Sequence, residues 1–155
     1  GIKLIEFNAR FGDPEAMNVL PILETDFVEI CQAIIDGRLD AMKIRFSPKA
    51  TVCLYVVPEG YPDAAKVGEP IIIGKTPEGV KLFYSSLNEG IDANLLTTGS
   101  RSIGVVGIAD TLEAARQGAV DGVRQISGKI FYRNDIGSNE LIQARIGFLE
   151  HLRKQ

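Results

Sequence analysis

The chain has 155 residues, of which 45% are hydrophobic and 24% charged, with 17 basic and 20 acidic side chains and a formal net charge of −3. This composition predicts an ordinary globular protein of one or two small domains. The acidic balance disfavours a nucleic-acid partner held by phosphate contacts. No apolar run approaches the roughly 20 residues that cross a membrane, so we expect no membrane partner.

Cysteine and histidine are scarce, which limits the chemistry. Cys31 and Cys53 are far apart and no Cys or His cluster accompanies them, so a structural zinc site is excluded on ligand count. Two free thiols indicate a reducing compartment, and we expect a cytoplasmic protein. The single histidine is His151. We therefore expect any catalysis to depend on carboxylates, amides, Arg, Lys or a bound metal.

The first residues predict a strand that leads into a short helix. Residues 2–8 largely alternate between apolar and polar side chains, as in a strand with one packed face. Asp13 then has the position of an N-cap and Pro14 that of the first helical residue. Pro21 ends this helix.

A second helix is predicted from Asp26 to Asp36. Asp26 and Glu29 have the spacing of a capping box, and Gly37 follows the last helical residue. The apolar residues at helical spacing predict its buried face: Phe27, Ile30, Cys31, Ile34 and Ile35.

Beyond residue 46 the pattern changes to short β-branched runs and then helices, which predicts an α+β domain. Strands are predicted at residues 50–57, 71–73, 80–84, 94–97, 103–109 and 129–132. Helices are predicted at 111–126, capped by Asp110, and at 139–152. The helix at 139–152 is expected to turn these side chains inward: Leu141, Ile142, Phe148, Leu149 and Leu152.

The segment from Glu6 to Glu15 carries the most chemistry. In a strand, Glu6, Asn8 and Arg10 would project from one face at steps of about 6.6 Å. A carboxylate beside an amide carbonyl supplies hard oxygen ligands, which suit Mg²⁺. Arg10 adds a fixed positive fork for phosphate or carboxylate oxygens, and Gly12 permits close approach of a ligand. The pattern indicates a metal–phosphate site.

A plainer interpretation of the same segment stays open. Glu6 and Asn8 could be solvated on an edge strand, and Arg10 could pair with Asp13 or Glu15. The Asp-Pro-Glu run is also a sound helix start without any function.

Two loops are further candidates. Residues 97–101, Thr-Thr-Gly-Ser-Arg, could hold an anion or form a plain turn between strands. The loop 133–138 contains Arg133 and Asp135 before a helix, and these two could bind a substrate or simply pair with each other. The Gly-Lys-Thr at 74–76 lacks the earlier glycine of a P-loop and is rejected.

The run Glu-Phe-Asn-Ala-Arg-Phe-Gly-Asp-Pro-Glu at 6–15 resembles the signature segment of the phosphoribosylamine–glycine ligases, also called glycinamide ribonucleotide synthetases, which are ATP-grasp enzymes of purine biosynthesis. The similarity continues in order through residues 20–21, 36–37, 50–53, 60–62, 102–112 and 131–137. It therefore covers most of the chain.

The resemblance implies an ADP-forming ligation. ATP would phosphorylate the carboxylate of glycine, and the amine of 5-phosphoribosylamine would attack the glycyl phosphate to give glycinamide ribonucleotide. By position, Glu6 and Asn8 match the family's ligands for Mg²⁺ (or Mn²⁺), and Arg10 and Asp13 match catalytic positions. The resemblance places Glu15 toward the glycine and phosphoribosylamine side. The loop with Arg133 and Asp135 is expected to contact either the substrate or the interface between the C-terminal domain and the ATP-grasp domain.

The resemblance also implies the architecture. Residues 1–46 would be the C-terminal segment of an ATP-grasp domain, and 47–155 the ligase C-terminal domain, a small β-rich unit with helices of a rudimentary hybrid-motif type. The chain begins at Gly1 instead of Met, and the family's nucleotide-clamping lysines and glycine-rich lid are not in it. We expect a processed or truncated piece that needs the N-terminal portion of the enzyme for turnover.

Two other interpretations stay open. The chain could be a non-catalytic α+β interaction module whose first strand is merely structural. It could also belong to another ATP-grasp carboxylate–amine ligase with a different acceptor.

Overall fold

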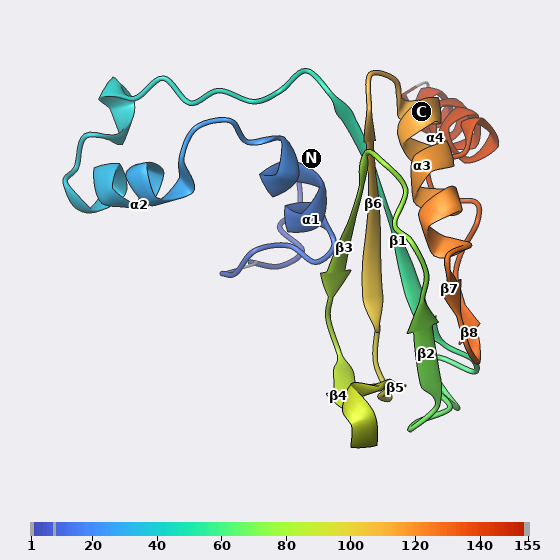
Figure 1. The fold of residues 1–155 in the computed structure, drawn as a ribbon. Helices are drawn as coiled ribbons and strands as arrows, with labels where there is room; N and C mark the ends of the chain where they lie inside the picture. The colour runs from blue at the N-terminus through green and yellow to red at the C-terminus, as the bar shows by residue number, and fades with distance from the viewer. Residues whose placement is uncertain (1, 8, 154–155) are drawn as a thin grey trace. The chain divides into compact units, whose positions relative to one another are not determined.

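The computed structural model describes residues 2–7 and 9–153. The chain divides into two compact units, an N-terminal unit of residues 1–47 and a C-terminal unit of residues 48–155 (Figure 1). Across the described residues, no helix has the length and apolar character needed to cross a bilayer.

The N-terminal unit is built from short helices. Its elements are α1 (Glu15–Val19), the 3₁₀ helix η1 (Leu20–Ile22), α2 (Phe27–Ile35) and the 3₁₀ helix η2 (Leu39–Ala41). The predicted start of α2 is confirmed, because the Asp26 carboxylate accepts hydrogen bonds from the backbone N–H groups of Val28 at 2.7 Å and Glu29 at 3.1 Å. Gly37, after the helix, has the positive φ of +64° that a helix end requires.

The start of α1 differs from the prediction. Its N-cap is Pro14, without a side-chain capping bond, and Asp13 lies one residue further out. The first turn is closed instead by the backbone, where the N–H of Ala16 donates to the carbonyl of Gly12 at 2.9 Å. With five residues, α1 has only a small summed dipole at its N-terminus.

The strand predicted at residues 2–8 is wrong for the part that the structure describes. Residues 2–7 adopt no regular structure, and Ile2, Ile5 and Phe7 are 102%, 93% and 86% exposed. Asn8 lies outside the described residues. Alternating polarity shows that a segment suits a sheet, but a strand forms only where a neighbouring strand completes its hydrogen bonds.

The buried face predicted for α2 is also wrong in part. Only Ile30 and Ala33 of this helix are buried, whereas Phe27, Ile34 and Ile35 are exposed. The reason is size, because a unit of short helices has too little apolar surface to cover a wide stripe.

The C-terminal unit is a mixed fold of helices and antiparallel sheets, as predicted. One sheet has the order β3-β6-β1-β8. Its strands are β1 (Ala50–Pro58), β3 (Val80–Tyr84), β6 (Ile103–Ala109) and β8 (Ile130–Phe131). In Figure 1 the three long strands lie side by side, with β6 paired to β1 from Ala50↔Ala109 to Val56↔Ile103.

A second sheet has the order β4-β5-β2-β7. Its strands are β2 (Pro70–Ile73), β4 (Leu87–Glu89), β5 (Leu95–Thr97) and β7 (Ile126–Ser127), and the 3₁₀ helix η3 (Ile91–Ala93) joins β4 to β5. The sequence predicted neither β4 nor β7, and it placed Ile126 in a helix. Ile126 fits helical spacing after Val123, and only its pairing with Ile73 makes it a strand residue.

Helix α3 (Leu112–Val123) packs on the first sheet and closes the core. Its cap is Thr111 and not Asp110, since Thr111 Oγ1 accepts from the N–H of Ala114 at 3.2 Å while Asp110 pairs with Lys49. The core is formed by residues of β1, β6 and α3, among them Val52, Leu54, Val56, Ile103, Val105, Ala115, Ala119 and Val123.

Helix α4 (Asn139–Arg153) ends the described chain. It was predicted to turn five apolar side chains inward, but it buries none of its residues. Its periodicity is that of an amphipathic helix, whereas burial also requires a surface to cover the apolar side.

Candidate functional site

The predicted metal–phosphate residues lie in the extended segment before α1. Glu6 and Arg10 are exposed, and Asn8, the second predicted ligand, lies outside the described residues. The guanidinium Nη1 of Arg10 donates to the carbonyl of Phe11 at 2.7 Å. Arg10 is therefore held by its own backbone neighbour in this structure.

Glu15 occupies the space next to Gly12. A Cβ built on Gly12 would lie 2.5 Å from Glu15 Oε2, so the glutamate side chain folds back over the glycine. The aromatic ring of Phe11 stacks at a tilt on that of Phe27, with centroids 5.9 Å apart. The close approach expected at Gly12 is thus made by Glu15, which places a carboxylate at the turn before α1.

The predicted metal ligands of this segment are one carboxylate, from Glu6, and one amide, from Asn8. Within residues 2–7 and 9–153, no three His, Cys, Asp or Glu side chains gather closely enough to hold an ion. Mg²⁺ usually takes only one or two protein oxygens and completes its shell with water and substrate phosphates. A site built on one carboxylate and one amide is compatible with that chemistry.

Arg133 and Asp135 contact each other. The guanidinium donates from Nε to Oδ1 at 3.0 Å and from Nη2 to Oδ2 at 2.6 Å, which is a bidentate pair. The hydrogen bond from Arg133 holds the pKa of Asp135 below its usual value, and the same bond raises the pKa of Arg133. The loop therefore presents a compensated ion pair at the surface.

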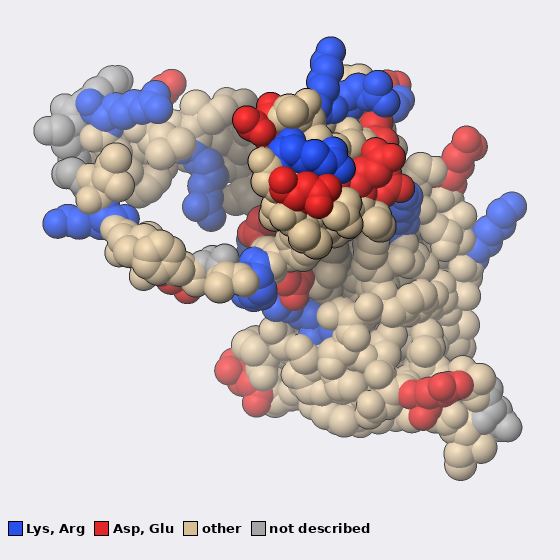
Figure 2. All heavy atoms as spheres, turned by 90° about the vertical axis from the view of Figure 1, so that its left-hand side faces the viewer, with Lys and Arg blue, Asp and Glu red and all other residues tan. Residues whose placement is uncertain are grey.

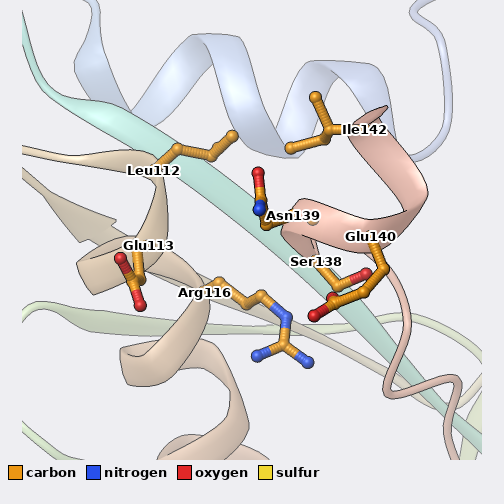
Figure 3. A pocket seen from close by; sticks show the side chains of 8 residues that line it. Leu112, Glu113, Arg116, Ser138, Asn139, Glu140 and Ile142 are labelled. Atoms are coloured by element: carbon orange, nitrogen blue, oxygen red, sulfur yellow. The ribbon is translucent and has the colours of Figure 1, made fainter. Parts of the chain in front are cut away.

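A cavity of about 460 Å³ opens next to this loop, between the first turns of α3 and α4 (Figure 3). It is lined by Leu112, Glu113, Arg116, Gly137, Ser138, Asn139, Glu140 and Ile142. Figure 3 shows Asn139 between Leu112 and Ile142, and Arg116 on the other side near Ser138.

Arg116 is the cavity residue that the sequence did not reveal. Its Nη2 donates to the carbonyl of Asn134 at 2.5 Å, while its buried Nε has no hydrogen-bond partner among the described residues. In sequence it resembles Arg124, a basic residue that follows directly after the last residue of α3. Only the fold, which brings residues 134–140 beside it, distinguishes the two.

The loop at 97–101 forms a hydrogen-bonded turn. The hydroxyl of Thr98 donates to the carbonyl of Ser86 at 3.0 Å and accepts from the N–H of Ser100 at 3.2 Å. The guanidinium of Arg101 lies 5.1 Å from the ring centroid of Tyr55. These contacts are the ones expected of a turn between two strands.

Several charged side chains of the C-terminal unit form ion pairs. Lys66 lies 2.7 Å from Glu59, and its hydrogen bond lowers the pKa of that carboxyl. Lys129 lies 2.8 Å from Glu69. On the face drawn in Figure 2, basic and acidic side chains stand next to one another, and the lower half of that face is largely uncharged.

The C-terminal unit has the fold of a small α+β domain, in which helix α3 covers one of two antiparallel sheets. Residues 51–139 match the sequence profile of the family described as phosphoribosylglycinamide synthetase, C domain. This match spans more than half of the chain, and the chain belongs to that family.

Individual proteins that are similar to this chain are consistent with the family assignment. A phosphoribosylamine–glycine ligase of Methanocella arvoryzae is 49% identical over 153 residues, and one of Methanocaldococcus jannaschii is 48% identical over 157 residues; each match covers 99% of this chain and 35% of the relative. The crystal structure of the Thermotoga maritima phosphoribosylamine–glycine ligase matches 86% of this chain and 33% of its own, with a TM-score of 0.65 and 29% identity. The chain thus spans about a third of these relatives.

Proposed function

We propose that the chain forms part of an ATP-dependent ligase that joins glycine to 5-phosphoribosylamine and yields glycinamide ribonucleotide, ADP and phosphate. The observation that carries this proposal is the similarity to ligases of that name along 99% of the chain. In the proposed reaction the glycine carboxylate takes the γ-phosphoryl group of ATP, and the amine of the acceptor then displaces phosphate from the glycyl phosphate.

The proposal extends to the two units. Residues 1–46 would complete an ATP-grasp domain, and residues 47–155 would be the ligase C-terminal domain with its rudimentary hybrid motif. Two observations support this division. The boundary between the two compact units lies between residues 47 and 48, and the match to the family profile lies within the second unit. About two thirds of each relative lies outside the matched part, so the chain by itself would not turn over.

Glu6 and Asn8 would hold Mg²⁺ or Mn²⁺, and the bound ion would neutralise charge on the nucleotide phosphates. Arg10 would steady the transferring phosphoryl group by its fixed charge, and Asp13 would act beside it. Support comes from the exposure of Glu6, Arg10 and Asp13, which leaves all three within reach of a nucleotide bound by the rest of the enzyme.

Glu15, Arg133 and Asp135 are proposed for substrate binding. The carboxylate of Glu15 is turned back to Gly12, close to the proposed catalytic segment. Arg133 and Asp135 are preorganised by their bidentate pair, which could exchange one partner for a substrate phosphate or amine. ATP, glycine and 5-phosphoribosylamine would be the small-molecule partners. The protein would be located in the cytoplasm.

The test is reconstitution. The chain is joined behind the N-terminal two thirds of the Methanocella ligase, and ADP release is followed with glycine and 5-phosphoribosylamine. We expect Glu6→Gln and Asn8→Ala to lower the rate about 100-fold and to raise the Mg²⁺ requirement, since a lost ligand removes several kcal/mol of charge stabilisation. Glu24→Gln, an exposed carboxylate of the same unit, is the matched control.

Three results would count against the proposal. Unchanged rates and unchanged Mg²⁺ dependence in both variants would show that the metal residues are assigned wrongly. No ADP release by the joined wild-type protein would favour a non-catalytic module. Release with another amine acceptor, and none with 5-phosphoribosylamine, would point to a different carboxylate–amine ligase.

A further inference from the structure

Helix α4 has an apolar side that the C-terminal unit leaves uncovered from residue 143 onward. At 100° per residue, six apolar side chains fall within an arc of about 160°. They are Leu141, Ile142, Ile146, Phe148, Leu149 and Leu152. From residue 143 onward every residue of the helix is exposed, with Phe148 at 59% and Leu149 at 52%.

The helix is not needed to complete the C domain. The family profile ends at residue 139, where α4 begins, and the core of the C-terminal unit contains no residue of α4. The Methanocella relative nevertheless matches along 99% of the chain, so it carries a counterpart of this helix. An apolar helix that lies outside the common domain fold requires a partner surface.

We infer that the apolar side of α4 packs against the portion of the ligase that lies outside this chain. The inference rests on the proposed function, because it takes that portion as the occupant. About two thirds of the length of each relative is available to supply the surface. The occupant is therefore a domain of the same polypeptide.

The size of the surface favours this occupant over a second copy of the chain. A helix of 15 residues is about 22 Å long and about 10 Å across, so a pair of such helices buries roughly 700 Å² in total. Stable complexes between separate proteins bury about 1,200 Å² or more, whereas interfaces between domains of one chain begin near roughly 600 Å². Covalent attachment supplies a millimolar effective concentration, so a contact of this size suffices within one polypeptide.

The experiment compares the isolated chain with the joined Methanocella protein. The chain contains no Trp, so Phe148→Trp places one reporter on the apolar side and Gln143→Trp one on the polar side. We expect the Phe148→Trp emission, taken as the difference from the unsubstituted protein, to move to shorter wavelength only in the joined protein. The Gln143→Trp emission is expected to be the same in both.

A second measurement, of the Tm, tests whether the contact of α4 stabilises the joined protein. Leu149→Glu should leave the Tm of the isolated chain within about 1 °C, because the side chain is exposed there, and lower that of the joined protein by about 3 °C or more. Gln143→Glu is the matched control and should change neither. If Leu149→Glu has no effect on the joined protein, or Phe148→Trp stays solvent-exposed in it, the inference is wrong.

Sedimentation of the isolated chain tests the other occupant. A dimer that Leu149→Glu dissociates would show that a second copy covers the helix and would overturn the inference. ADP release separates the two proposals. A joined protein that buries the Phe148→Trp reporter but forms no ADP contradicts the proposed function alone, and an active protein with an exposed reporter contradicts this inference alone.

Discussion

Thr97 shows how a single buried hydroxyl fixes the second sheet of the C-terminal unit. The residue is fully buried, and its Oγ1 accepts from the N–H of Glu69 at 3.0 Å and donates to the carbonyl of Lys66 at 2.7 Å. Thr97→Val keeps the shape and leaves both backbone groups unpaired. We expect a loss of about 1–3 kcal/mol in the free energy of unfolding, measured by urea denaturation.

Thr97→Ser is the matched control for that change. It keeps the hydroxyl and removes only a methyl group, so it should cost clearly less than Thr97→Val. Equal costs for the two variants would show that packing, and not the hydrogen bonds, accounts for the buried threonine.

The Arg133–Asp135 pair makes a prediction about pH. The pKa of Asp135 lies below its ordinary value of 3.8, chiefly through the hydrogen bond from Arg133. Because the folded pKa is depressed, the stabilisation is present above the unfolded pKa and is lost as the pH falls from about 3.8 through the folded pKa. Arg133→Gln should raise the pKa of Asp135 toward 3.8, as measured by NMR titration of its carboxyl carbon.

Arg124→Gln serves as the control for the titration. It removes an exposed arginine that pairs with Asp121 and not with Asp135. An Asp135 pKa that does not move in Arg133→Gln, or that moves as much in Arg124→Gln, would contradict the pair.

At the level of elements, the contact between α3 and β6 depends on a glycine. A Cβ on Gly107 would lie inside the van der Waals distance of the Ala115 carbonyl and 2.6 Å from Ala119 N, both backbone atoms that cannot swing away. Gly107→Ala should therefore cost about 3 kcal/mol or more in the free energy of unfolding, or prevent folding. Circular dichroism followed during urea denaturation measures it.

A second glycine of the same contact provides the control. A Cβ on Gly118 of α3 would be 3.7 Å from Val80 and 3.8 Å from Gly107, which is ordinary contact. Gly118→Ala should stabilise the protein by about 0.5–1 kcal/mol, because alanine favours the helix. A large loss in Gly118→Ala would mean that the helix lies closer to the sheet than the structure has it.

The elements also differ in how far their sequences predicted them. Strands β3 and β6 were predicted to the residue, since both are apolar runs between turn residues and both pair along their length. The segment 2–8 alternates between apolar and polar side chains, but its described part, residues 2–7, has no neighbouring strand among the described residues. Helix α4 was predicted correctly in its extent and wrongly in its burial. Local pattern decides the conformation that a segment prefers, and the neighbours decide whether it is paired or buried.

For the whole molecule, we expect the two units to differ in stability. The N-terminal unit buries Ile30 and Ala33, whereas the C-terminal unit contains a continuous apolar core. Amide hydrogens of α2 should therefore exchange about 100-fold or more faster than those of β1, β6 and α3. Hydrogen exchange followed by mass spectrometry checks this, and equal protection in α2 and β6 would contradict it.

The sequence by itself determined the family and the order of most elements, because these depend on residue types at fixed spacings, and the metal–phosphate chemistry of the segment at 6–15 stays a prediction. It also identified Asp26 as the cap of α2, which is a local interaction. Tertiary structure alone decided that Arg116 faces a cavity and that the C-terminal unit leaves the apolar side of α4 uncovered from residue 143 onward. Each of these depends on which distant segments meet, and chain spacing does not encode such meetings locally.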